Sequence, residues 1–261
     1  MTVLGILSAK GGVGASLVAT NLGCFLAGSK QTLLIDLNPG SGADDLLLDL
    51  SPQRSWVDLL PVVKELEPKH IQRIIARHPS GLNFMCSPKV WLKDIDWLAV
   101  VQLLGSLSND SEWLLLDMPT GMPESTQSVL SMLDIALIIT TADPPALRGA
   151  GRLINALPTG LRRRSGLVVN QITRRHPVSP TRIARSMDIP LLAALQPDSR
   201  AVGYQVSFGN PCVSDRRSLF GSGIVLLGAN LRQAVKEHEE RYHASALKTP
   251  QRMGRFKGRR W

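Results

Sequence analysis

Cysteine is scarce in this 261-residue sequence, and long apolar runs are lacking. The three cysteines, Cys24, Cys86 and Cys212, are odd in number, far apart and without the spacing of metal ligands. This pattern excludes a disulfide framework, so we expect reduced thiols. No apolar run approaches the roughly 20 residues that span a bilayer, and Met1 leads into an apolar segment without a charged leader. We therefore expect a cytoplasmic protein.

The composition favours one sizeable α/β domain. Apolar residues make up 44% of the chain, which is enough for one large core at this length. Neither repeats nor internal linkers are present. We predict that residues 1–244 form the domain and that residues 245–261 form a basic, flexible tail.

Positive charge is concentrated in that tail. The formal net charge is +9, and the last fourteen residues contain six cations and no acidic side chain. Such a segment can bind an anionic membrane surface or DNA, or stay solvated. Pro250, Gly254 and Gly258 would interrupt a helical face, which weakens the membrane interpretation. The six cations are Lys248, Arg252, Arg255, Lys257, Arg259 and Arg260.

The chain begins with a strand, a glycine-rich loop and a helix. An apolar run from Val3 to Leu7 leads into Lys10-Gly11-Gly12-Val13-Gly14, and a helical pattern begins near Ser16. A turn of this kind directs backbone N–H groups at an anion, and the helix N-terminus adds partial positive charge. The stretch therefore predicts a site for a phosphate chain. A glycine turn without a ligand is the alternative.

This loop departs from the general phosphate-loop pattern, G-x-x-x-x-G-K-[ST]. Ala9 and Ala15 stand where the first glycine and the lysine are expected. The early Lys10 and the later hydroxyl of Ser16 resemble the deviant phosphate loop of the MinD/ParA family of ATPases. The resemblance implies a three-layer P-loop NTPase fold with a mostly parallel central sheet, in which Lys10 reaches ATP across a dimer interface. It places ATP against Lys10, Gly11, Gly12, Val13, Gly14, Ala15, Ser16 and Leu17.

Two later apolar runs, 32–36 and 113–117, each end in a carboxylate. Asp117 resembles the family's Walker B residue, which holds the water shell of Mg²⁺ beside the loop hydroxyl. A capping Asp on a buried strand is the alternative. Asn38 replaces a family aspartate that positions the attacking water, and an amide cannot take a proton from that water. The resemblance assigns Mg²⁺ to Ser16, Asp36 and Asp117, and catalytic roles to Lys10 and Asp36.

Three more strands are predicted, at 134–140, at 165–170 and from residue 190. Asp143 and the prolines after it predict the start of a helix. In the family, the residue matching Asn170 reads the adenine edge, since an amide offers a donor and an acceptor together. Stopping the strand is the alternative role for Asn170. The resemblance also places Pro197 and Asp198 beside the base.

The middle of the chain predicts short helices and one strand. The segments 46–52, 77–82 and 87–88 resemble the ATPase domain of CpaE/TadZ proteins, which localise pilus-assembly systems at the cell pole. Because His78 stands before Pro-Ser-Gly, we expect a turn residue and not a ligand. The expected helices are 43–49, 56–61, 68–76, 94–107 and 220–244, and the expected strand is 82–86.

Taken together, these patterns predict an ATP-binding protein with weak or absent hydrolysis, because the loop lysine and the second switch aspartate are missing. The resemblance implies a homodimer that recruits a Tad-type pilus or secretion machine from the cytoplasm, the inner-membrane surface or a cell pole. A MinD-like component of cellulose secretion, a non-hydrolysing scaffold and a DNA-partition ATPase are the alternatives.

Overall fold

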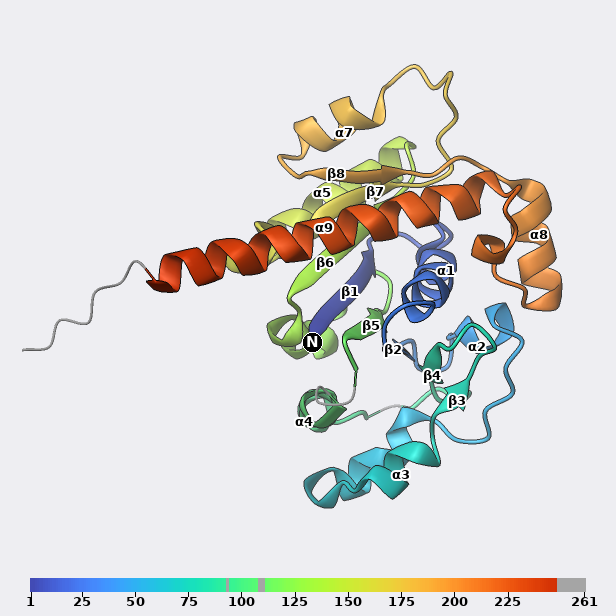
Figure 1. The fold of residues 1–261 in the computed structure, drawn as a ribbon, viewed down its shortest axis with the longest axis vertical. Coiled ribbons are helices and arrows are strands. Elements are labelled where there is room, and N and C mark those ends of the chain that lie inside the picture. The colour runs from blue at the N-terminus through green and yellow to red at the C-terminus, as the bar shows by residue number, and fades with distance from the viewer. Residues whose placement is uncertain (93, 108–110, 248–261) are drawn as a thin grey trace, which may run out of the picture.

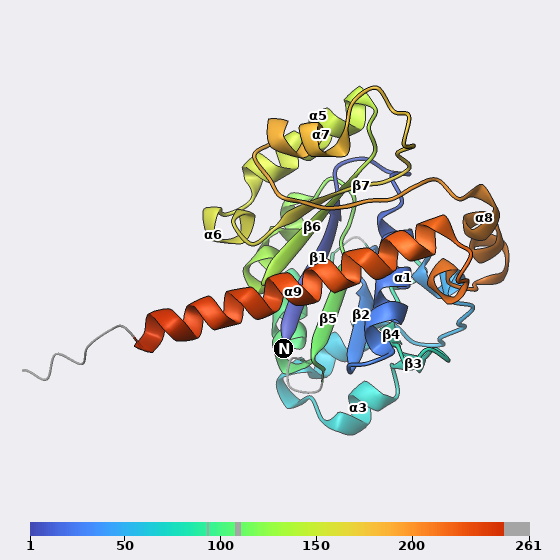
Figure 2. The ribbon, with the colours of Figure 1, turned by 45° about the horizontal axis from the view of Figure 1, so that its top comes forward.

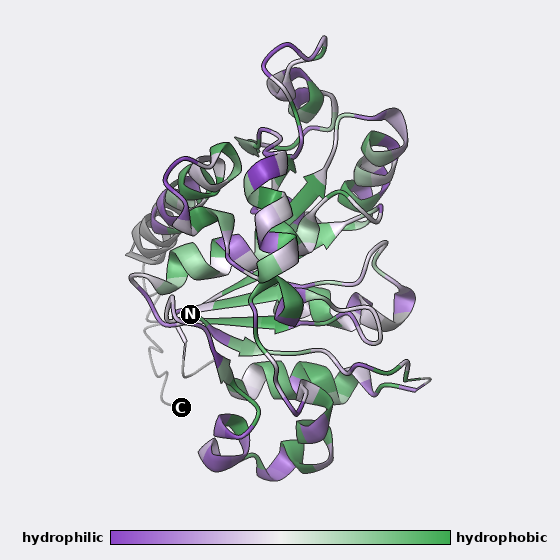
Figure 3. Ribbon diagram, turned by 90° about the vertical axis from the view of Figure 1, so that its right-hand side faces the viewer, coloured by the Kyte–Doolittle hydropathy of each residue, from purple (hydrophilic) through white to green (hydrophobic). Residues whose placement is uncertain are grey.

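The apolar segments form strands buried on both faces, as a parallel sheet covered by helices requires. The computed structural model describes residues 1–92, 94–107 and 111–247. Nearly every residue is buried in the five central strands, and the strands at the centre of the sheet are coloured mainly as hydrophobic in Figure 3. These strands are β1 (Thr2–Ser8), β2 (Thr32–Asp36), β5 (Trp113–Asp117), β6 (Ile135–Thr140) and β7 (Gly166–Val169).

The sheet has eight strands in the order β3-β4-β2-β5-β1-β6-β7-β8. The outer strands are β3 (Ala76–Arg77), β4 (Asn83–Met85) and β8 (Leu191–Ala194). Every neighbouring pair is parallel except β3 and β4. This confirms the prediction of a mostly parallel central sheet in one α/β domain, and it brings the carboxyl ends of the central strands to one edge.

Helices cover both faces of the sheet, which gives the three layers (Figures 1 and 2). On one face, α1 (Ala15–Ala27) and α9 (Leu219–Leu247) pack against Leu4 and Ile6. On the other face, α4 (Trp97–Leu107), η2 (Glu124–Met132) and α5 (Pro144–Ala156) pack against Val3 and Leu7. The remaining helical segments are α2 (Asp44–Leu47), η1 (Trp56–Glu65), α3 (Pro68–Gln72), α6 (Thr159–Arg162), α7 (Pro180–Ser186), α8 (Ser199–Phe208) and η3 (Cys212–Ser214).

The segment before β4 differs from the prediction. The helix expected over 68–76 ends at Gln72, and Ala76 enters the antiparallel strand β3. A tight turn causes this reversal, because His78 N–H donates to Leu82 O and Gly81 has a φ of 89°. His78 is therefore a turn residue, as predicted, and its Nδ1 accepts from the backbone N–H of Ser80.

Helix boundaries also differ at three places. The helix expected over 94–107 begins at Trp97, because the Asp96 carboxylate accepts from the N–H groups of Leu98 and Ala99 and so caps the first turn. The segment expected over 56–61 is a 3₁₀ helix that continues to Glu65. The last helix includes Leu247, three residues beyond its expected end at residue 244.

The remaining expectations concern the termini and thiols. All three cysteines are free and buried. No helix within the described residues is both long and apolar enough to cross a bilayer. The six cations predicted to form a polyanion-binding tail lie outside the described residues.

Candidate functional site

The glycine-rich loop joins β1 to α1 at the carboxyl edge of the sheet. Gly12 and Gly14 have φ angles of 79° and 89°, a left-handed conformation that side chains with a Cβ adopt at a cost. Lys10 and Gly12 are exposed, whereas Val13 is buried and anchors the loop in the core. The loop therefore presents its backbone to solvent at a helix N-terminus, as a phosphate-binding loop must.

Asn170 packs directly under this loop. It follows β7, is 2% exposed, and its Nδ2 donates to Val13 O at 2.8 Å. Its Oδ1 accepts from the N–H of Gln171. A Cβ on Gly14 would lie 2.5 Å from the Asn170 Nδ2. In this structure Asn170 holds the loop in place, and its contact with adenine stays a prediction.

The two strand-end carboxylates lie side by side. Asp36 and Asp117 are partners in the register of β2 and β5, and both are 1% exposed. Ser16 Oγ donates to Asp117 Oδ2 at 2.6 Å. Asn38 Nδ2 lies 3.0 Å from Asp36 Oδ1 and 3.1 Å from Asp117 Oδ2. The structure thus brings together all three residues predicted to hold Mg²⁺. The side-chain amide of Asn38 donates hydrogen bonds to both carboxylates and so links them.

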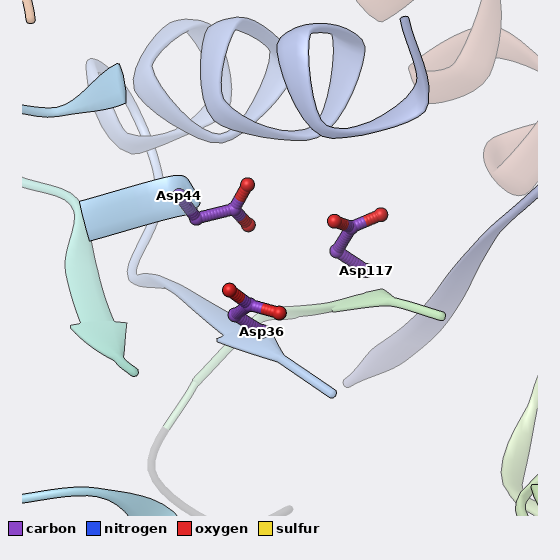
Figure 4. A group of neighbouring side chains, drawn as sticks. All are labelled: Asp36, Asp44 and Asp117. Carbon is purple, nitrogen blue, oxygen red and sulfur yellow. The ribbon is translucent and has the colours of Figure 1, made fainter. Parts of the chain in front are cut away.

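A third carboxylate, Asp44, joins this pair and was not predicted. It lies at the start of α2 and is fully buried. Oxygens of Asp36, Asp44 and Asp117 all lie within 4.8 Å of one another (Figure 4). The chain can return to the sheet edge because Gly42 has no side chain. A Cβ at this position would overlap Asp36 Oδ2. The only sequence signal is the glycine pair at 40 and 42 before Asp44.

Burial dominates the electrostatics of these acids. It raises the pKa of Asp36 to about 6, although hydrogen bonds from Asn38 oppose the rise. Burial and the charge of Asp36 raise the pKa of Asp117 to about 8. Burial and the charges of Asp117 and Asp36 raise the pKa of Asp44 well above its usual range. Three buried acids at this spacing stay fully ionised only beside a cation.

The residues present fit Mg²⁺. This ion takes oxygen ligands, usually one or two carboxylates together with waters and phosphates. Asp117 Oδ1 is buried without a hydrogen-bond partner in the described residues, so it is free to receive a ligand. Ser16, on the first turn of α1, lies between this carboxylate and the phosphate loop.

A cavity lies beside Asn170. It has a volume of about 260 Å³ and is lined by Leu17, Asn170, Pro197 and Asp198, among others. The three residues predicted beside the base therefore line one cavity, together with Leu17, which was predicted to contact ATP as part of the loop segment. Asp198 also caps α8, because its Oδ1 accepts from the N–H of Ala201.

Lys10 is held within its own chain. Its Nζ lies 2.9 Å from Asp143 Oδ1, and the two side chains are 47% and 38% exposed. Hydrogen bonds from Thr141 and Lys10 hold the pKa of Asp143 at about 2. Asp143 caps α5, as predicted, by accepting from the Ala146 N–H. The action of Lys10 across a dimer stays a prediction.

This parallel sheet, with its glycine-rich loop and its strand-end carboxylates, defines a nucleotide-binding α/β protein of the phosphate-loop class. Residues 4–211 match the family described as the CobQ/CobB/MinD/ParA nucleotide binding domain, and the chain belongs to this family.

Relatives agree with this assignment, and solved structures share the fold. The septum site-determining protein MinD of Synechocystis is 25% identical over 224 residues, covering 82% of this chain and 83% of its own. The MinC:MinD complex of Aquifex aeolicus superposes with a TM-score of 0.77 at 25% identity, covering 89% and 96% of the two chains. A ParA family ATPase from Chlorobium tepidum has a TM-score of 0.80 at 20% identity, covering 87% and 97%. The MinD of Pyrococcus horikoshii, complexed with Mg-ADP, has a TM-score of 0.71 at 20% identity, covering 87% and 94%.

Proposed function

We propose that this protein binds ATP with Mg²⁺ and acts as a nucleotide-linked homodimer that positions a larger machine in the cell. One observation carries the proposal. The phosphate loop, the Ser16–Asp117 pair and the cavity at Asn170 all lie at the carboxyl edge of the sheet, which supports one site for phosphate, metal and base. The solved MinD with Mg-ADP supports the choice of ligand.

The machine served is inferred from sequence. The segments 46–52, 77–82 and 87–88 resemble CpaE/TadZ proteins, so we propose recruitment of a Tad-type pilus or secretion assembly at the inner-membrane surface or a cell pole. We also propose that the loop from Lys10 to Ser16 is a deviant phosphate loop of the MinD/ParA type. A MinD-like component of cellulose secretion and a non-hydrolysing scaffold are the alternatives on the same fold.

We expect ATP to bind with slow or no turnover. Ala15 leaves out a cation that would offset the phosphate charge, and Asn38 cannot accept a proton from water. Calorimetric titration with ATP and Mg²⁺ tests binding, and phosphate release tests turnover. Ala15→Lys should tighten binding about tenfold, because hydrogen bonds to charged groups contribute about 1.5–3 kcal/mol. No ATP binding at millimolar concentration would refute the proposal, and turnover of about 1 per second or faster would refute slow hydrolysis.

A second candidate, DNA binding as in a partition ATPase, is favoured by a separate observation. Residues 144–187, which we call the arginine segment, contain nine arginines and no acidic, lysine or aromatic residue. Of the 30 Lys and Arg residues, nine lie in this segment and six in the tail. The rest of the chain contains the other fifteen and all 21 acidic residues, so the net positive charge comes from these two segments. Among the described residues, only Arg162 of this group forms an ion pair, with Asp188.

The arginine segment changes the expectation for the tail. Exposed arginines without aromatics suit phosphates better than a membrane interface, which favours aromatic side chains. We expect DNA binding to weaken both on removal of residues 248–261 and on replacement of Arg174 and Arg175 by serine. Shift assays at two salt concentrations measure this, and the salt dependence should become shallower with each change. Lys64→Ser with Lys69→Ser is the control, because these two cations stand in a segment that also contains Glu65 and Glu67. Undiminished DNA binding after both changes together would exclude these cations as the contact surface.

A further inference from the structure

Asp44 stands out because a nucleotide-bound Mg²⁺ does not require it. Asp36 and Asp117 come from strand ends, whereas Asp44 is brought back by the segment after β2. Figure 4 shows the three carboxylates, from β2, β5 and the start of α2, directed into one common space beside α1. The cluster therefore contains one acidic residue more than the magnesium site predicted from sequence.

Three carboxylate oxygens of the cluster accept no hydrogen bond from the described residues. Asp36 Oδ1 accepts from the N–H and the amide of Asn38, and Asp117 Oδ2 accepts from Ser16 and Asn38. Both oxygens of Asp44 and the Oδ1 of Asp117 are buried and lack a partner in the described part of the chain. An unpaired buried carboxylate is costly, so these oxygens call for a ligand.

Neighbouring side chains do not supply that ligand. Lys89, a cation on this side of the molecule, lies 3.9 Å from Asp45 and forms its ion pair there. A proton shared between two carboxylates would satisfy two of the three oxygens at most. A divalent cation would lie within reach of one oxygen from each of the three carboxylates.

We propose that Asp36, Asp44 and Asp117 form a site that binds Mg²⁺ or Mn²⁺ without a nucleotide. Three carboxylates and a few waters complete an octahedral oxygen shell, which suits these ions better than the larger Ca²⁺. The proposal rests on the proposed function, because the same ion would lie beside Ser16 when ATP enters. The bound ion ties the segment from Asn38 to Asp44 to β5, so the loop after β2 is ordered before ATP arrives.

The test uses full-length protein freed of metal with a chelator and then desalted. Mn²⁺ is titrated without nucleotide and followed by electron paramagnetic resonance, and the melting temperature is measured in parallel. We expect one Mn²⁺ per chain and a rise in melting temperature. Asp44→Asn should weaken Mn²⁺ binding at least about tenfold, since even residues behind the ligands cost 10–100-fold. Asp45→Asn, which removes the same charge one residue away, should bind as the wild type does.

The outcomes separate this inference from the proposed function. Asp44→Asn removes an unpaired buried acid, so without metal it should melt no lower than the wild type, and only the rise caused by Mn²⁺ should be lost. Wild-type protein that binds no Mn²⁺ at millimolar concentration, or an Asp44→Asn variant that binds it normally, would overturn the inference while ATP binding with Mg²⁺ could remain. Mn²⁺ binding without any ATP binding would leave the inference intact and overturn the proposed function.

Discussion

Replacing Gly14 by alanine is expected to weaken ATP binding by at least tenfold while leaving the domain folded. Gly14 has a φ of 89°, and a left-handed residue with a Cβ costs about 1–2 kcal/mol. The new Cβ would also lie 2.5 Å from Asn170 Nδ2, the group that holds Val13 O. The loop or Asn170 must therefore move, and about 1.4 kcal/mol lost from binding is a factor of ten.

The chain offers a matched control for this variant. Gly81, in the turn before β4, also has a φ of 89°, but a Cβ there meets nothing closer than Ala27 O at 3.5 Å. Gly81→Ala should therefore lower the melting temperature through backbone strain alone and leave ATP binding unchanged. Calorimetric titration and thermal melting of both variants separate backbone strain from loss of the site. Equal ATP affinity of Gly14→Ala and wild type would show that this loop does not hold the nucleotide.

The carboxylates at the strand ends could be predicted from sequence because their placement follows from topology. A buried run such as 32–36 forms a parallel strand, and parallel strands end at the same edge. Asp36 and Asp117 therefore had to be near each other once both runs entered one sheet, and the register confirms it. The fold was predictable for the same reason.

Asp44 was not predictable because a loop determines its position. The segment between Asp36 and Asp44 contains Gly40 in a left-handed conformation and Gly42 in close contact with Asp36. Neither feature produces a periodic pattern in the sequence. Strand β3 was missed for a related reason. Residues 68–76 have a helical pattern, but pairing with β4 across the turn at His78 prevails over local preference at Ala76.

The dimer prediction concerns Lys10. To act across the dimer, its side chain must leave Asp143 of its own chain and contact the ATP bound to the second chain. Lys10 and Asp143 are 47% and 38% exposed, and exposed pairs contribute about 0–1 kcal/mol. Such a pair is weak enough to break when a second chain brings ATP within reach. Lys10→Ala is therefore expected to leave the monomer stable and to reduce ATP-dependent dimerisation at least tenfold, because charge-assisted bonds to phosphate contribute about 1.5–3 kcal/mol.

Light scattering with and without ATP and Mg²⁺ measures this effect, and Lys30→Ala is the matched control. Lys30 forms an exposed ion pair with Glu112 away from the phosphate loop, and the two side chains are 50% and 54% exposed. Its removal should leave the monomer–dimer balance unchanged. Asp143→Asn is a second test. It frees Lys10 from its ion pair without removing the lysine, so it should increase ATP-dependent dimerisation. If Lys10→Ala and Lys30→Ala dimerise equally with ATP, the lysine does not act between chains and its pair with Asp143 is only a local contact of the loop.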